Sequence, residues 1–140
     1  MNLEFFREFK DPYIQNEQGK GIFLAGVVLG YIAKSQVGSE KDIKNAPLFK
    51  QIQFGRMDMK NLKKQLARVP QLLAAYSDKR GEISIVAPHL VSVLSAEAGK
   101  MILSGTGAEL GTEGNFAFTV GFVNANNYFW RVFRKESEDE

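Results

Sequence analysis

One stretch of the chain, Ile22–Lys34, holds about twelve consecutive apolar residues and limits the possible folds more than any other. It is shorter than the roughly 18–20 apolar residues that a membrane span needs, and a lysine lies near each end, so a buried core helix is expected. Gly26 and Gly30, four residues apart, would let a neighbouring backbone approach closely. A helix that is apolar on every side must be surrounded by other helices. The stretch therefore predicts an all-α fold, a helical bundle of about five or six helices.

The length of 140 residues and the hydrophobic content of 44% fit one globular domain. We expect a single helical-bundle domain over residues 1–135 and a frayed, solvated acidic tail over residues 136–140. The chain has no cysteine, which excludes disulfides, thiolate metal sites and cysteine nucleophiles. Its single histidine, His89, indicates neither a metal site nor a catalytic site, and no cofactor is expected. The first residues lack the pattern of a secretory signal, so a cytoplasmic location is expected.

Positive charge is concentrated in the middle of the chain. The formal net charge is only +2, but residues 41–80 contain ten basic and three acidic residues, a local net charge of +7. Such a concentration indicates an anionic partner better than the overall charge does. Near the C-terminus, by contrast, Arg131, Arg134 and Lys135 adjoin the acidic tail, which we expect to neutralise them in part.

The densest part of this basic region is a predicted amphipathic helix from Met59 to Tyr76, with Asp58 as its N-cap. Pro70 disfavours helical geometry at the residue before it, so a kink or break is expected near Val69. Cations occupy the side of the helical wheel opposite the apolar residues. Such a row matches phosphates by charge without reading bases, although a solvated helix face is the ordinary alternative. The candidate nucleic-acid-binding residues are Arg56, Lys60, Lys63, Lys64 and Arg68, together with the turn residues Lys79 and Arg80.

Most of the remaining chain also has helical periodicity. In the first half of the chain we expect a short docking helix over residues 2–9 and a core helix that starts between Asp11 and Ile22 and ends near Val37. A further helix is expected over residues 46–54. In the second half we expect a helix from about Pro88 to Ser104, followed by a glycine-rich loop over residues 105–114. The sequence I-S-I-V at residues 83–86 also fits a strand, because isoleucine and valine are β-branched and such residues favour strands.

Residues 115–135 fit two patterns. Phe116, Phe118, Val120 and Phe122 alternate with other residues, which is typical of a strand. Phe118, Phe122 and Phe129 also follow helical spacing, and Thr112-Glu113 offers a cap. Because the periodic stretch is longer than most strands, we predict a helix. Its aromatic residues fit a core or interface role better than stacking on nucleic-acid bases.

Three segments together resemble a known family. They read G-I-F-L-A-G-V-V-L-G-Y-I-A-K-S-Q from Gly21, A-P-L-F-K-Q-I-Q-F-G-R-M-D-M-K-N-L-K-K-Q-L from Ala46, and F-A-F-T-V-G-F-V-N-A from Phe116. With L-L-A-A-Y after Gln71, they are similar to the C-terminal helical region of the large subunit of type I-B CRISPR effector complexes (Cascade). The resemblance covers roughly residues 15–130.

This resemblance implies a helical bundle without catalytic residues. It implies the small subunit of the complex, which such systems make from an internal translation start, although a portion of the large subunit itself fits equally well. A subunit of this kind lies along the belly of the complex and helps to hold the hybrid of guide RNA and target DNA and the displaced DNA strand. The implied partners are the Cascade large subunit and backbone subunits, guide RNA, either strand of the target DNA and further copies of the chain itself, with no membrane.

Two other functions compete with this reading. The first is a free-standing helical interaction module that binds an acidic protein partner through the same cations. Salt dependence separates the two in part, because phosphate binding weakens log-linearly with salt. The second is an enzyme with acid–base carboxylate pairs, which the spacing of Glu82, Glu97, Glu109 and Glu113 does not support.

Overall fold

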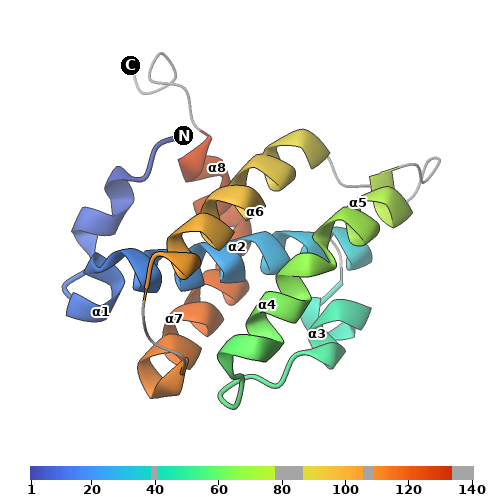
Figure 1. Ribbon diagram of the computed structural model, residues 1–140. Coiled ribbons are helices and arrows are strands. Elements are labelled where there is room, and N and C mark those ends of the chain that lie inside the picture. The colour runs from blue at the N-terminus through green and yellow to red at the C-terminus, as the bar shows by residue number, and fades with distance from the viewer. Residues whose placement is uncertain (39–40, 78–86, 106–108, 134–140) are drawn as a thin grey trace.

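The computed structural model describes residues 1–38, 41–77, 87–105 and 109–133, and α2 (Glu17–Val37) is the centre of the fold. Figure 1 shows α2 crossing the middle of the molecule with other helices around it. Its residues 21–33 are all buried, as the apolar stretch predicted. The helices that pack on α2 include α6 (Pro88–Leu103), α7 (Gly111–Val123) and α8 (Ala125–Val132). No strand occurs in the described ranges, which confirms the all-α bundle.

Shorter elements complete the bundle. The N-terminal segment forms a 3-10 helix, η1, whose Phe5 and Phe6 are buried, so the predicted docking role of residues 2–9 is confirmed. The predicted helix over residues 46–54 is shorter than expected, because Ile52 leaves helical geometry and buries its side chain in an extended conformation. The N-terminal 3-10 helix, η1, spans Glu4–Glu8. The remaining elements are α1 (Pro12–Gln15), η2 (Ile43–Asn45), α3 (Pro47–Gln51), α4 (Met59–Ala67) and α5 (Val69–Ser77).

Glycines let α2 and α7 touch backbone to backbone. A Cβ atom at Gly26 would overlap the carbonyl oxygen of Phe118, and one at Gly30 would overlap the carbonyl oxygen of Phe122. From the other side, Gly121 of α7 meets the backbone of α2 in the same way. This close approach offsets the cost of about 1 kcal/mol for each interior glycine. The glycine pair of the core helix therefore serves packing within the bundle.

The predicted helix boundaries depend on local side-chain chemistry. Asp58 accepts a hydrogen bond from the backbone N–H of Asn61 at 2.7 Å, which confirms it as the predicted N-cap. Asp11 caps α1 in the same way, because it accepts from the backbone N–H of Tyr13 at 2.9 Å. Gly38 ends α2 with a φ of 78°, a conformation that favours glycine. The predicted break before Pro70 is also present, because α4 ends at Ala67 and α5 begins at Val69.

The second half of the chain confirms one ambiguous prediction and corrects another. Residues 115–123 are helical within α7, so the helix prediction was right. The predicted glycine-rich loop over residues 105–114 was too long, because α7 begins at Gly111. The predicted cap at Thr112-Glu113 was also wrong, because no side chain makes a capping hydrogen bond at the N-terminus of α7. Gly111 has a φ of 66°, which turns the chain into the helix. The alternative strand at residues 83–86 lies outside the described ranges.

Candidate nucleic-acid interface

Helix α4 has buried apolar residues on one side and exposed lysines on the other. Met59 and Leu62 are buried and pack into the core, which stabilises the fold by about 1.5–3 kcal/mol for each side chain. Lys60, Lys63 and Lys64 lie on the outer side and are exposed to solvent. We call these three lysines the α4 lysine row. Their positions follow from the helical period, because burying Met59 and Leu62 turns the three lysines outward.

Arg56 belongs to the turn before α4 and not to the helix, which corrects its placement on the same helical wheel. Its backbone N–H donates to the carbonyl of Gln53 at 3.0 Å, and Gly55 in this turn has a φ of 82°. The side chain of Arg56 is exposed. It adds a fourth cation near the N-terminal end of the α4 lysine row.

Arg68 differs from the other candidate cations because protein groups already hold its guanidinium. The side chain is half-buried, and its Nη1 donates to the Oε1 of Gln51 and, at 3.0 Å, to the Oε1 of Gln65. These contacts join α3 to α4. The two remaining candidates, Lys79 and Arg80, lie outside the described residues.

Two buried amides hold the segment that carries these cations. Asn115 of α7 accepts a hydrogen bond from the backbone N–H of Met57 at 2.8 Å and donates to the Met57 carbonyl at 3.0 Å. Gln36 of α2 accepts from the backbone N–H of Leu48 at 2.9 Å. Both side chains are only 7% exposed. Sequence reasoning missed them, although a polar residue within an apolar helical pattern was an available signal.

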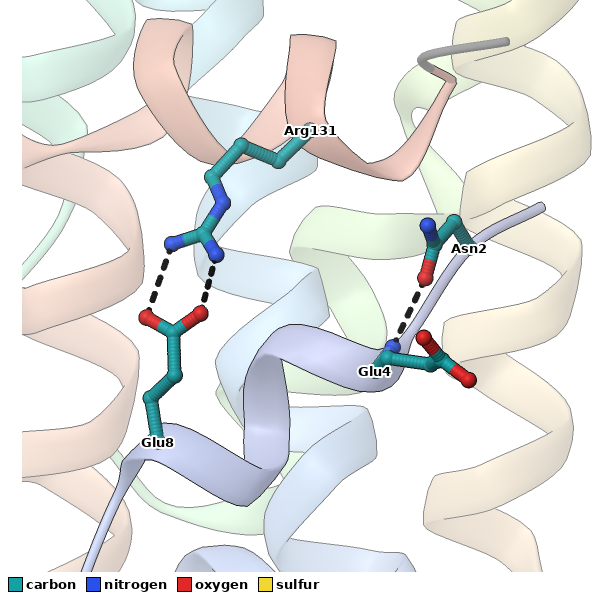
Figure 2. Close-up of polar contacts among 4 residues, drawn as sticks. All are labelled: Asn2, Glu4, Glu8 and Arg131. Carbon is teal, nitrogen blue, oxygen red and sulfur yellow. Dashed lines mark hydrogen bonds and ion pairs between the residues drawn. The ribbon is translucent and has the colours of Figure 1, made fainter. Parts of the chain in front are cut away.

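No described acidic side chain forms an ion pair with Arg56 or with the α4 lysine row. The ion pair within the described residues lies elsewhere, between Arg131 of α8 and Glu8 of η1 (Figure 2). The expected neutralisation of Arg131 by the acidic tail falls on residues 136–140, which lie outside the described residues; within the described residues its partner is Glu8. The lysines of α4 are therefore exposed and have no described carboxylate partner.

Arg131 is fixed by several contacts at once. Its guanidinium carbon lies 5.4 Å from the ring centroid of Phe5 and 6.0 Å from that of Tyr128, in addition to the bidentate contact with Glu8. The hydrogen bond from Arg131 lowers the pKa of the Glu8 carboxyl and raises the pKa of Arg131 itself. Nearby, the backbone N–H of Asn2 donates to the Val132 carbonyl at 2.7 Å. These contacts join the N-terminal segment to α8.

The aromatic residues of α8 serve mainly the core. Phe129 is fully buried and stacks on Tyr31, with ring centroids 3.9 Å apart and an interplanar angle of 13°. Tyr128 packs against Phe5 and Phe23. Of this group, only Trp130 is largely exposed. These contacts agree with the core reading of the aromatic run.

The described residues contain neither a metal-binding group nor a membrane-spanning helix. Their His, Asp and Glu side chains form no group of three that could hold a metal ion. Among the same residues, no helix is both long enough and apolar enough to cross a membrane.

Comparison with known proteins identifies the family. The family model described as CRISPR-associated protein TM1802 (cas_TM1802) C-terminal domain matches residues 2–136. No curated protein and no solved structure matches the chain. Because the match covers nearly the whole sequence, the chain belongs to this CRISPR-associated family. The membership confirms the family resemblance seen in the sequence and supports a Cascade-related role.

Proposed function

We propose that this CRISPR-associated protein is a non-catalytic small subunit of a type I-B Cascade. In this role it supports the guide RNA–target DNA hybrid and the displaced DNA strand, and it helps to assemble the complex from its large and backbone subunits and further copies of itself. It needs no cofactor, and it acts in the cytoplasm, where its nucleic-acid partners would be.

The observation that carries this proposal is the α4 lysine row. Three exposed lysines and Arg56 face solvent without a described carboxylate partner. Cations in this state can bind phosphates without first breaking an internal ion pair, and they provide electrostatic support that is independent of base sequence. Sequence recognition in guided complexes belongs to base pairing, so a cationic support is the contribution a protein can make.

Exposed apolar side chains on α7 support the assembly part of the proposal. Phe116 and Val123 are 62% and 55% exposed, and their spacing of seven residues places them on one side of the helix. The half-buried Val120 lies between them on the same side. We assign this α7 side to docking on the large subunit.

The test is target-DNA binding by a reconstituted type I-B complex in which the large subunit's own internal start is silenced. The variant is Lys60→Glu/Lys63→Glu/Lys64→Glu, which changes only exposed side chains. We expect the complex to assemble and to bind target DNA more weakly. The slope of log affinity against log salt should fall by up to about 2–3, since each lost phosphate contact contributes about 0.7–0.9.

A matched control is Arg7→Glu/Lys10→Glu/Lys100→Glu, which makes the same change of charge at exposed residues outside α3 and α4. If both triple variants weaken DNA binding equally, general charge and not the α4 lysine row explains the effect. If the first variant binds DNA with unchanged affinity and salt slope, the proposal is wrong.

The competing function, binding of an acidic protein, predicts a different pattern. The α4 lysine row would then be needed for assembly of the protein complex in the absence of any nucleic acid. Size-exclusion chromatography of the complex without guide RNA and target DNA, with and without the first triple variant, separates these two functions.

A further inference from the structure

We propose that copies of this chain associate head to tail, with the exposed side of α7 in one copy packed against the exposed side of α6 in the next. This inference rests on the proposed function, which includes further copies of the chain, and it names the two surfaces that meet. In such an array, the α7 side of the first copy faces the large subunit. The α7 side of each later copy faces the copy before it.

Helix α6 has an exposed apolar side. Val93 and Leu103 are 37% and 71% exposed, and Ala96 between them is exposed as well. These three residues share one side of the helix, because they are three and seven positions apart. Leu94 and Ala98, which are fully buried, lie on the opposite side. We call Val93, Ala96 and Leu103 the α6 apolar side.

Helix α7 presents a similar side with bulkier residues. Phe116, Val120 and Val123 follow one another at intervals of four and three residues, so they also share one side of their helix. Phe118 and Phe122, which are buried, point to the core from the other side. We call Phe116, Val120 and Val123 the α7 apolar side. Each of the two helices therefore buries one side in its own bundle and leaves a second apolar side at the surface.

The two apolar sides face away from each other, because α6 and α7 pack on opposite sides of α2. A Cβ atom at Gly21 of α2 would lie 2.9 Å from the carbonyl oxygen of Ala98 in α6, whereas Cβ atoms at Gly26 and Gly30 would overlap carbonyl oxygens of α7. At about 100° per residue, Gly26 and Gly30 lie roughly 140–180° from Gly21 around the axis of α2. A contact between two different surfaces leaves one of each free at the ends, so it can repeat as an open array.

The two sides complement each other in size. The ring of Phe116 projects from α7 and needs space in the surface that it meets. Ala96 and Gly99 provide this space on α6, since a Cβ atom at Gly99 would meet nothing within 4 Å. When the two helices lie antiparallel with Phe116 over Ala96, Val120 lies against Val93 one turn away.

The same antiparallel arrangement brings opposite charges together. Lys100 follows Ala96 by four residues and is exposed, and Glu113 precedes Phe116 by three residues and is also exposed. Neither charge forms an ion pair within the described part of the chain. With Phe116 over Ala96, Lys100 of one copy faces Glu113 of the next. This complementarity in charge, together with that in size, favours a second copy as the occupant of both sides.

The experiment measures association of the full chain without nucleic acid by analytical ultracentrifugation, at concentrations up to about 1 mM, the range of weak specific contacts. Phe116→Glu blocks the α7 apolar side, and Ala96→Glu blocks the α6 apolar side. We expect the unmodified chain to form progressively longer species. Each variant alone should associate at least about thirtyfold more weakly, as for a central interface residue. A mixture of the two variants should form 1:1 dimers that do not grow, because each variant keeps the side that the other lacks.

The control variants Asn127→Glu and Gln71→Glu add the same charge at exposed residues of α8 and α5 and should leave association unchanged. Reversal of the facing charges gives a second readout. Lys100→Glu or Glu113→Lys alone should weaken association about two- to fivefold, and the double variant should restore it.

Dimers formed by Ala96→Glu alone would overturn the proposal, since they would show that two α7 sides pair with each other. An unmodified chain that stays monomeric would also overturn it. In that case the proposed function stands if DNA binding by the reconstituted complex still depends on the α4 lysine row. Association in solution without incorporation into that complex would overturn the proposed function and leave the contact between α6 and α7 supported.

Discussion

Arg131 and the α4 lysine row are both cationic surfaces on helices, but their surroundings are opposite. Arg131 is held by the carboxylate of Glu8 (Figure 2). It also lies near two aromatic rings, and its contacts connect α8 to the N-terminal segment. Lys60, Lys63 and Lys64 point to solvent and have no described ion-pair partner.

The difference shows how to separate structural from functional charge in this fold. A cation that already has a carboxylate would have to lose that contact before binding a phosphate, so Arg131 contributes to stability. An unpaired lysine contributes little to stability and is free to bind an external anion. The position of the α4 lysine row, in contrast to that of Arg131, depends on the buried side-chain amide of Asn115. This amide bonds the backbone of Met57 and so fixes the segment that leads into α4.

The largest expected effect comes from breaking this support. In Asn115→Ala, the backbone N–H and carbonyl of Met57 lose their buried partners, and the Gly111 carbonyl loses one as well. We expect the free energy of unfolding to fall by about 2–4 kcal/mol, because unsatisfied buried groups cost about 1–3 kcal/mol each. Urea denaturation measures this change. The control Asn127→Ala, at an exposed residue, should stay within about 0.5 kcal/mol. A similar small effect for Asn115→Ala would show that α4 does not depend on this amide.

A smaller effect is expected at the paired cation. Arg131→Ala removes the contacts with Glu8, Phe5 and Tyr128 together and should destabilise the fold by about 1 kcal/mol, mainly through the lost ring contacts and side-chain packing. Arg7→Ala, at an exposed arginine of η1, should have no measurable effect. Thermal unfolding compares the two variants. If they behave alike, Arg131 is not structural and the contrast with the α4 lysine row fails.

The smallest expected effect depends on pH. The hydrogen bond from Arg131 lowers the pKa of Glu8 below its ordinary value of 4.5, so the folded state binds a proton at Glu8 less readily than the unfolded state. The contribution to stability is therefore present above the unfolded pKa and is lost as the pH falls through the lower, folded pKa. Glu8→Gln should reduce the melting temperature slightly near pH 7, and the reduction should shrink as the pH is lowered below 4.5 toward the folded pKa. An equal difference at every pH would show that the ion pair does not contribute.

Local patterns predicted most of the fold. The apolar stretch around Gly26 and Gly30 identified α2 and its burial, and Pro70 identified the break between α4 and α5. The boundaries were less accurate where long-range packing decides. Ile52 leaves the helix to reach the core, and α7 begins inside a glycine-rich segment, because its apolar side packs on α2.

The sequence predicted that the α4 lysines are exposed, but it did not predict how the neighbouring cations are bonded. Burial of Met59 and Leu62 turns Lys60, Lys63 and Lys64 outward, and the helical period contains that information. The period of α4 could not place Arg56, which lies in the preceding turn. Nor could it show that Arg68 bonds to two glutamines.

The amino-acid sequence alone determined that this protein is a helical bundle around one apolar helix, with a lysine row on the outer side of α4. Both properties follow from periodicity and charge over a few neighbouring residues. Only the tertiary structure decided which cations are neutralised and which stay free. It also decided that Asn115 supports Met57, 58 residues away. Contacts at such separations depend on how whole helices pack, and no local pattern in the sequence encodes them.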